Sequence, residues 1–215
     1  MSTISELNLL IPRNEAKQGE PAWDVALLFP PQGEWTEEEY WALNQNTNWL
    51  IELSDGFLEV LPMPTPFHQR IVQFLFKVLE AFVLAHAKGE VFFAPLPVRL
   101  WEGKMREPDI LYVRPGRIPD PHRPAEGADL AMEVVSEGKK SRERDLVIKP
   151  SEYARAQIAE YWIVDIEKGT ITVLRLEADH YVVHGEYGPG SQAASVLLPG
   201  FSVDVAAVFA AGIKT

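Results

Sequence analysis

Two carboxylates in this sequence occupy positions where an acidic side chain needs an explanation. Glu133 interrupts the apolar run Ala131-Met132-Glu133-Val134-Val135, and a buried carboxylate is unfavourable unless a partner compensates its charge. Asp109 follows Pro108, which cannot donate a hydrogen bond to a β-ladder and therefore marks the start of a strand. If the two strands are neighbours, Asp109 and Glu133 could place oxygen atoms around one hard divalent cation such as Mg²⁺.

Each of these residues also has a structural interpretation. Glu133 could be a carboxylate that only pairs with a base or lies at a solvated edge, and Asp109 could be an ordinary turn residue. Because both acids occur together, a shared metal site is favoured over a separate structural role for each of them.

Basic residues are concentrated between positions 139 and 149, where they could hold a phosphodiester beside the carboxylates. They are Lys139, Lys140, Arg142, Arg144 and Lys149. Charged runs of this kind are usually solvated loops.

His68 is a further candidate for the site because it lies in the first turn of an expected helix, although a single histidine more often packs or hydrogen-bonds locally.

The elements that must position these residues follow from apolar periodicity, capping residues and turn signals. Helices are expected at 35–45, from Thr65-Pro66 to about Lys88-Gly89, and at 150–157. Strands are expected at 49–53, 57–61, 90–94, 97–101, 109–113, 130–136, 161–165, 171–176 and 181–184. The polar residues 137–145 are expected to connect a strand to the third helix.

This order of elements predicts a mixed α/β (α+β) fold. A long helix on a mostly antiparallel run, followed by strand–helix–strand, requires one crossover connection. Residues 1–34 are rich in proline, glycine and charge and are expected to form an extended N-terminal arm. Residues 35–215 are expected to form a single domain.

Composition excludes several classes of protein. The 215 residues include no cysteine, which rules out disulfides, thiolate zinc sites, iron–sulfur clusters and a cysteine nucleophile. The net charge is −11, but eleven acids and only two bases lie in the first 60 residues, so the rest of the chain remains compatible with a polyanion. No apolar run is long enough to span a membrane and no signal peptide is evident, so a cytoplasmic protein is expected.

Taken in order, the motifs resemble the PD-(D/E)XK nuclease superfamily, and more specifically the restriction endonucleases of the Uma-two type. The similar residues run from about Trp35 to Phe209. They are Asp55-Gly56, His68, Glu107-Pro108-Asp109-Ile110, Met132-Glu133-Val134-Val135-Ser136, Asp145 with Lys149 and Tyr153, and Glu160-Tyr161-Trp162-Ile163-Val164-Asp165. The resemblance implies a restriction-endonuclease-like mixed β-sheet flanked by helices, dependence on Mg²⁺ (or Mn²⁺), and hydrolysis of DNA phosphodiester bonds.

The resemblance also implies roles for individual residues. Asp109 and Glu133 match the metal-binding acids, and the position of His68 implies a third metal ligand. The superfamily's lysine should lie two residues after the glutamate, where this chain has Val135. A lysine displaced to the following helix would be Lys149, which Pro150 is expected to place at the start of that helix.

The leading prediction is a metal-dependent endodeoxyribonuclease in which Asp109, Glu133 and Lys149 are catalytic. DNA is the expected partner, together with a second copy of the chain, because cutting a duplex needs two active sites. The alternative is a catalytically inactive nuclease-fold module that binds DNA or protein, which Val135 and the acidic first 60 residues favour. A sugar hydrolase with paired carboxylates is a third interpretation, but no motif indicates an aromatic sugar-binding cleft.

Overall fold

The computed structural model describes residues 29–213, so most of the expected arm 1–34 lies outside the described residues. The chain divides into two compact units. The first contains the described residues up to Met63 together with Glu102–Met105, and the second contains Pro64–Trp101 and the residues from Arg106 onward. The boundary between an arm 1–34 and a single domain 35–215 therefore stays a prediction. Within the described residues, no helix combines the length and the apolar character needed to cross a membrane.

The first unit contains the expected short helix and hairpin. Helix α3 (Glu37–Asn44) begins with a capping box, in which the Thr36 hydroxyl accepts from the Glu39 N–H at 3.2 Å and the Glu39 carboxylate accepts from the Thr36 N–H at 2.9 Å. Strands β1 (Ile51–Ser54) and β2 (Phe57–Val60) are antiparallel. Asp55 and Gly56 form the turn with φ angles of 51° and 83°, the geometry that Asp-Gly favours. Strand β5 (Lys104–Arg106) pairs with β1 through Lys104 and Met105.

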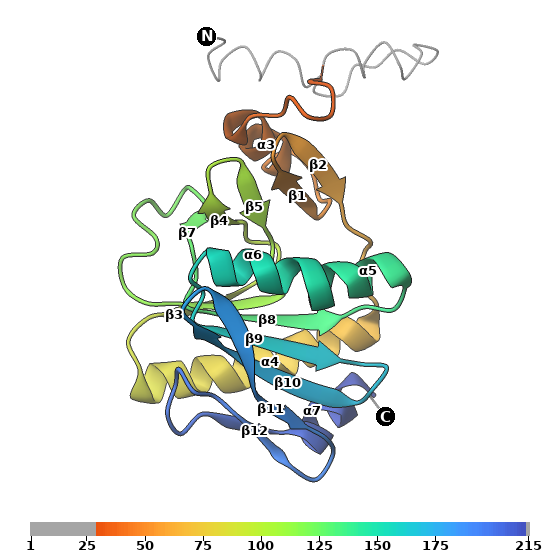
Figure 1. Ribbon diagram of the computed structural model, residues 1–215, viewed down its shortest axis with the longest axis vertical. Helices are drawn as coiled ribbons and strands as arrows, with labels where there is room; N and C mark the ends of the chain where they lie inside the picture. The colour runs from red at the N-terminus through yellow and green to blue at the C-terminus, as the bar shows by residue number, and fades with distance from the viewer. Residues whose placement is uncertain (1–28, 214–215) are drawn as a thin grey trace. The chain divides into compact units, whose positions relative to one another are not determined.

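The second unit is built on a six-stranded mixed sheet (Figure 1). In spatial order its strands are β11 (His180–Tyr187), β10 (Thr170–Glu177), β9 (Glu160–Asp165), β8 (Leu130–Val135), β6 (Ile110–Val113) and β3 (Glu90–Phe93). Strands β8 and β9 are parallel, and the other neighbours are antiparallel. The parallel pair is joined by helical segments, which confirms the mixed α/β fold with its crossover.

Helices cover both faces of this sheet. Helix α4 (Pro66–His86) buries the stripe Ile71, Leu75, Leu79 and Val83 against one face, together with Met132, Val134, Trp162 and Val164 of the sheet. The segments α5 (Lys139–Glu143) and α6 (Lys149–Arg155) lie on the opposite face (Figure 1). There Tyr153 packs with Ala131, Val135, Tyr161 and Ile163. The alternation within β8 therefore places Glu133 on the same face as Val135, as its period of two requires.

The remaining elements complete the second unit. Strands β4 (Val98–Trp101) and β7 (Ala125–Glu126) are parallel to each other. Strands β12 (Gln192–Ala194) and β13 (Ser202–Asp204) form an antiparallel pair. Helix α7 (Val205–Gly212) follows β13 and contributes Val205 and Val208 to the core beneath α4.

The expectation that residues 137–145 form a polar connection is wrong. Residues 139–155 are helical throughout, with a π-helical turn η1 (Arg144–Ile148) between α5 and α6. The sequence did not predict a helix here because the segment has few apolar residues with helical spacing. Its buried face is instead made of charged side chains that find partners in the folded protein, among them Asp145 and Lys149.

Glu160 has a structural role that its place in the family motif does not reveal. Its carboxylate is fully buried at the start of β9. It accepts four hydrogen bonds: from Trp162 Nε1 at 2.6 Å, Ser195 Oγ at 2.7 Å, the Val196 N–H at 2.6 Å and the Leu197 N–H at 2.8 Å. The carboxylate thus ties the segment before β13 to the sheet.

Replacing Glu160 by Gln should lower the free energy of unfolding by about 2–3 kcal/mol, because one acceptor oxygen becomes an NH₂ group facing N–H donors. Urea unfolding provides the measurement. Glu177→Gln is the matched control, since Glu177 is exposed and its ion pair with Arg175 is of a kind worth no more than about 1 kcal/mol. Equal losses in the two variants would contradict the structural role of Glu160.

Candidate active site

The pairing of β6 with β8 brings the two candidate carboxylates onto neighbouring strands. Ile110 lies opposite Met132 in this antiparallel pair, so Glu133 lies next to Asp109, the residue immediately before β6. Oδ2 of Asp109 accepts a hydrogen bond from the Val134 N–H at 2.8 Å. The expected adjacency of the two strands is therefore confirmed, and the backbone of β8 orients the Asp109 carboxylate.

His68 reaches the same place from helix α4. Thr65 caps this helix by accepting the His68 N–H at 3.2 Å, and Pro66 occupies the first helical position. The buried His68 places Nε2 3.2 Å from Oδ2 of Asp109. Burial lowers the pKa of His68, but the hydrogen bond and charge of Asp109, with the charge of Glu133, raise it by more, so the net pKa lies above its ordinary value.

Glu133 is held from the opposite direction by the crossover helix. Lys149 Nζ and the Tyr153 hydroxyl each donate to Oε1 of Glu133 at 2.7 Å. Lys149 is only 1% exposed, and its Nζ also lies 3.6 Å from Oδ1 of Asp145. The spacing of Asp145, Lys149 and Tyr153 by four residues places all three on one side of the helical segment, facing β8.

A π-helical turn directly precedes Lys149, and it lets this residue keep helical geometry although Pro150 follows it. The N–H of Lys149 bonds to the carbonyl of Arg144, five residues earlier, and Lys149 has helical φ and ψ of −57° and −40°. Lys149 is the first residue of α6, as Pro150 predicted, but it has helical geometry and continues the π-helical turn, so it is not a cap outside the helix. A proline inside a helix removes one regular hydrogen bond, and here the register change at η1 immediately precedes it.

The surroundings of Glu133 raise the pKa of its carboxyl to about 8. Burial is the main cause, because it disfavours the charged form. Lys149 lowers the pKa, whereas the nearby negative charges of Asp109 and Asp145 raise it again. The pKa of Glu133 thus lies well above that of an ordinary carboxyl, and perturbed pKa values of this kind are frequent at functional sites.

This shift predicts a pH-dependent contribution of Glu133 to stability. Because its pKa is about 8 in the folded protein and near 4.5 in the unfolded chain, the folded state binds the proton more tightly. The contribution is fully present below about pH 4.5 and is lost as the pH rises through about 8. The free energy of unfolding of the parent, minus that of Glu133→Gln, should therefore fall between about pH 5 and about pH 9. Urea unfolding in EDTA measures it, and a difference that is flat or rises with pH would contradict the shift.

The donor set fits a hard divalent cation bound by few protein ligands. The contacts above use Oδ2 of Asp109 and Oε1 of Glu133, which leaves the second oxygen of each carboxylate for a cation. Mg²⁺ usually takes one or two carboxylates and keeps several waters. Among residues 29–213, no cluster of three or more His, Cys, Asp and Glu side chains is suited to hold a metal. The assignment of Asp109, Glu133 and His68 as metal ligands stays a prediction.

The basic cluster around residues 139–149 is only partly available to a phosphodiester. Arg142 makes two hydrogen bonds to Asp165, at 3.0 and 2.7 Å, and an ion pair with Glu167. Arg144 Nε lies 3.0 Å from Oδ1 of Asp145. Lys139 and Lys140 are exposed. Two of the five bases therefore face solvent, and the others take part in ion pairs within the fold.

The sequence reasoning assigned no role to Tyr153 or Asp145, which complete the surroundings of Glu133 and Lys149. Their spacing from Lys149 was the signal that could have placed them on the same helix face.

An ion pair between Arg106 and Glu152 also holds the helical segment in place, through two hydrogen bonds of 2.7 and 2.8 Å. It fixes α6 to the residue that begins the Arg106-Glu107-Pro108-Asp109 segment.

Comparisons with known proteins identify the family and a similar fold. Residues 37–206 match the family described as Putative restriction endonuclease (Uma2). The fold is similar to the crystal structure of a putative nuclease belonging to DUF820 from Anabaena variabilis, with a TM-score of 0.63 and 16% sequence identity. That match covers 88% of this chain and 98% of the other. No curated protein matches the chain.

The family match covers most of the chain, and it includes every residue of the cluster around Glu133. The strand pairing and the crossover helix bring Asp109, Glu133, Lys149 and Tyr153 together, whereas Glu160 makes its hydrogen bonds at the opposite end of β9. This chain belongs to the Uma2 family, described as Putative restriction endonuclease.

Proposed function

We propose that this protein is a metal-dependent endodeoxyribonuclease that hydrolyses DNA phosphodiester bonds at Asp109, Glu133 and Lys149. The observation that carries the proposal is the buried Glu133 carboxylate, which shares Oε1 with Lys149 and Tyr153 and lies on the strand beside Asp109. Membership of a family of restriction endonucleases supports DNA as the substrate.

Asp109 and Glu133 would hold one Mg²⁺ or Mn²⁺ ion, with His68 as a further ligand or as the group that orients Asp109. The ion would polarise the scissile phosphate and lower the pKa of a bound water. A metal competes with the proton on Glu133, so ionisation of this residue would accompany metal binding.

Lys149 takes the place of the superfamily's usual lysine. Val135 occupies the customary position and cannot donate a hydrogen bond, whereas the Lys149 ammonium reaches the Glu133 carboxylate from the helical segment. A positive charge here could stabilise the negative charge that develops on the phosphate. Tyr153 keeps Glu133 in position by donating its hydroxyl hydrogen to the same oxygen.

The proposal is tested by incubating the protein with supercoiled plasmid in Mg²⁺, in Mn²⁺ and in EDTA. Nicked or linear DNA should form with either metal and not in EDTA. Retention of the plasmid in a gel shift without any cleavage would instead support the alternative, a catalytically inactive module that binds DNA.

The proposal extends to a homodimer, because cleavage of both strands of a duplex requires two active sites. Sedimentation of the protein with and without a DNA duplex tests this assembly. A cytoplasmic location also stays a prediction.

A further inference from the structure

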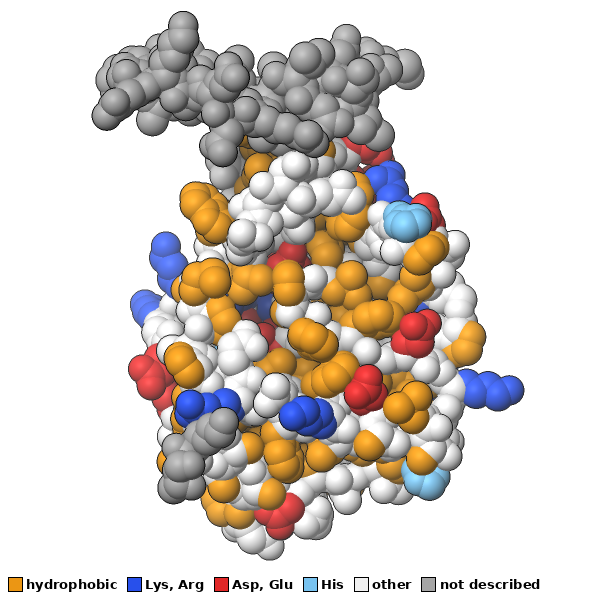
Figure 2. Space-filling model, turned by 180° about the vertical axis from the view of Figure 1, so that it is seen from behind, with side chains coloured by type: hydrophobic (Ala, Val, Ile, Leu, Met, Phe, Trp, Pro, Cys, Tyr) orange, Lys and Arg blue, Asp and Glu red, His pale blue; other side chains and the backbone are white. Residues whose placement is uncertain are grey.

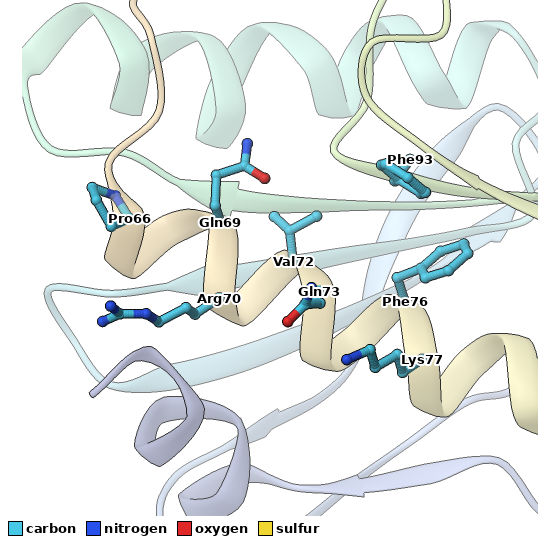
Figure 3. A pocket seen from close by; sticks show the side chains of 8 residues that line it. All are labelled: Pro66, Gln69, Arg70, Val72, Gln73, Phe76, Lys77 and Phe93. Atoms are coloured by element: carbon cyan, nitrogen blue, oxygen red, sulfur yellow. The ribbon is translucent and has the colours of Figure 1, made fainter. Parts of the chain in front are cut away.

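A groove of about 460 Å³ lies between helix α4 and the edge strand β3. Its lining is Pro66, Gln69, Arg70, Val72, Gln73, Phe76, Lys77 and Phe93. Seven of these residues lie on two neighbouring rows of α4, and Figure 3 shows Phe93, on the facing strand, near Phe76. Residues spaced by three and four on a helix form such rows, and a helical span from 66 to 77 is about 17 Å long.

The groove begins beside the candidate active site. Gln69, in its lining, follows His68 directly on α4. Phe93, on the opposite wall, pairs with Ile110 across the strands, and the next N–H, of Ala94, donates to the carbonyl of Asp109 at 3.1 Å. Two separate elements thus connect the groove to the residues that hold Asp109.

The charge of the lining suits a polyanion. Arg70 and Lys77 contribute two cationic groups, and none of the eight lining residues carries a carboxylate. One guanidinium nitrogen of Arg70 is anchored by a 3.1 Å hydrogen bond to the Gly212 carbonyl, and Lys77 is exposed. Figure 2, seen from the side on which α4 lies, shows single cationic and acidic side chains set apart among extensive hydrophobic surface.

The aromatic wall suits the face of a nucleobase. Phe93 is 53% exposed, and its ring meets Phe76 edge-on with the centroids 4.8 Å apart and the planes at 71°. This contact fixes the Phe93 ring while leaving much of it open. Proteins that bind single-stranded nucleic acid combine such an aromatic platform with cations along the backbone, whereas the base faces of an intact duplex are stacked and hidden.

We propose that this groove binds unpaired nucleotides of a DNA strand next to the phosphate that is cleaved. A base stacks on Phe93, and the phosphates of the strand contact Lys77 and Arg70. The proposal rests on the proposed nuclease function for the identity of the strand as DNA. It adds that the enzyme prefers DNA with unpaired nucleotides beside the cut.

The test is binding of fluorescein-labelled oligodeoxythymidine of about 12 nucleotides, and of the matched duplex, by anisotropy in EDTA. Phe93→Ala should weaken binding of the single strand about tenfold, from the loss of stacking on one base. Lys77→Glu should weaken it and reduce the slope of log affinity against log salt by about 0.7, the value for one phosphate contact to a single strand. Both losses should be larger for the single strand than for the duplex.

Two control variants make the same chemical changes outside the groove. Leu84→Ala removes an apolar side chain that is 80% exposed on the same helix and does not line the groove. Lys168→Glu reverses an exposed charge in the turn between β9 and β10. Three strand spacings separate β9 from β3 in the sheet, or about 14 Å. Both controls should bind the single strand as the parent does.

The outcomes separate this proposal from the nuclease function. If the parent cleaves plasmid while Phe93→Ala and Lys77→Glu bind the single strand normally, the groove proposal fails and the nuclease function stands. If the parent does not cleave but both variants lose single-strand binding, the groove proposal stands and the nuclease function fails. No binding of the single strand by the parent, or equal losses for strand and duplex, overturns the groove proposal.

Thermal melting of each variant checks folding. If Phe93→Ala does not fold, Lys77→Glu still tests the proposal, because Lys77 is exposed.

Discussion

Glu133→Gln should reduce metal-dependent DNA cleavage by at least about 10³-fold, equivalent to about 4 kcal/mol of transition-state stabilisation. The change removes one of the two carboxylates that would hold the cation while keeping the shape of the side chain. Because burial already raises the pKa of Glu133 to about 8, a neutral side chain is well suited to this position. Folding should therefore survive the substitution.

Plasmid nicking in Mg²⁺ and in Mn²⁺, with thermal melting of the same samples, measures both effects. Glu137→Gln is the matched control, since Glu137 is exposed just after β8, and it should cleave as the parent does. Cleavage by Glu133→Gln at the parent rate would remove Glu133 from the active site. A loss of cleavage that follows a loss of folding would assign Glu133 a structural role alone.

Lys149→Met should lower both cleavage and stability. Loss of a charge partner in the transition state typically reduces the rate by about 10²–10³-fold. The ammonium is 1% exposed and lies 2.7 Å from Glu133, and breaking a buried ion pair by removing one partner usually costs about 3–5 kcal/mol. Glu133 can escape this penalty by taking up a proton. The loss of stability should therefore be large at about pH 9 and small at about pH 6.

Urea unfolding at the two pH values and plasmid nicking provide the measurements. Lys168→Met makes the same change at an exposed position in the turn between β9 and β10, and both its stability and its cleavage should match the parent. If Lys149→Met cleaves as fast as the parent, the assignment of Lys149 as the displaced catalytic lysine fails. A loss of stability that is the same at both pH values would contradict the uptake of a proton by Glu133 between about pH 9 and about pH 6.

The helices and strands that carry the candidate site are visible in the sequence because their signals are local. Thr65 and Pro66 mark the start of α4, and the three-and-four spacing of its apolar residues marks its length. Pro108 marks the entry to β6. The adjacency of the strands that lead from Asp109 and carry Glu133 was also predictable, since the two strands follow one another closely in the chain.

Other features depend on contacts between distant parts of the chain. Residues 139–149 carry charges that are typical of a solvated loop, yet they form a helix because Arg142 and Lys149 find buried or half-buried carboxylates on β9 and β8. The π-helical turn before Pro150 is likewise invisible to local propensity. Glu160 has the appearance of a motif residue, but only the fold shows that it accepts hydrogen bonds from a loop about 35 residues later.

The sequence alone therefore determined helix α4, the six strands of the larger sheet and the two acids that could share a cation, because periodicity, capping and proline geometry act within a few residues. It did not indicate the helix over residues 139–148, the short strands β5, β7, β12 and β13, or helix α7. The tertiary structure decided which base meets which acid, how the pKa of Glu133 shifts, and that Phe93 stands beside Lys77 and Gln69 in one groove. These properties follow from burial and from charges brought together across the sheet, and electrostatic energy depends on distance and solvent access rather than on separation along the chain.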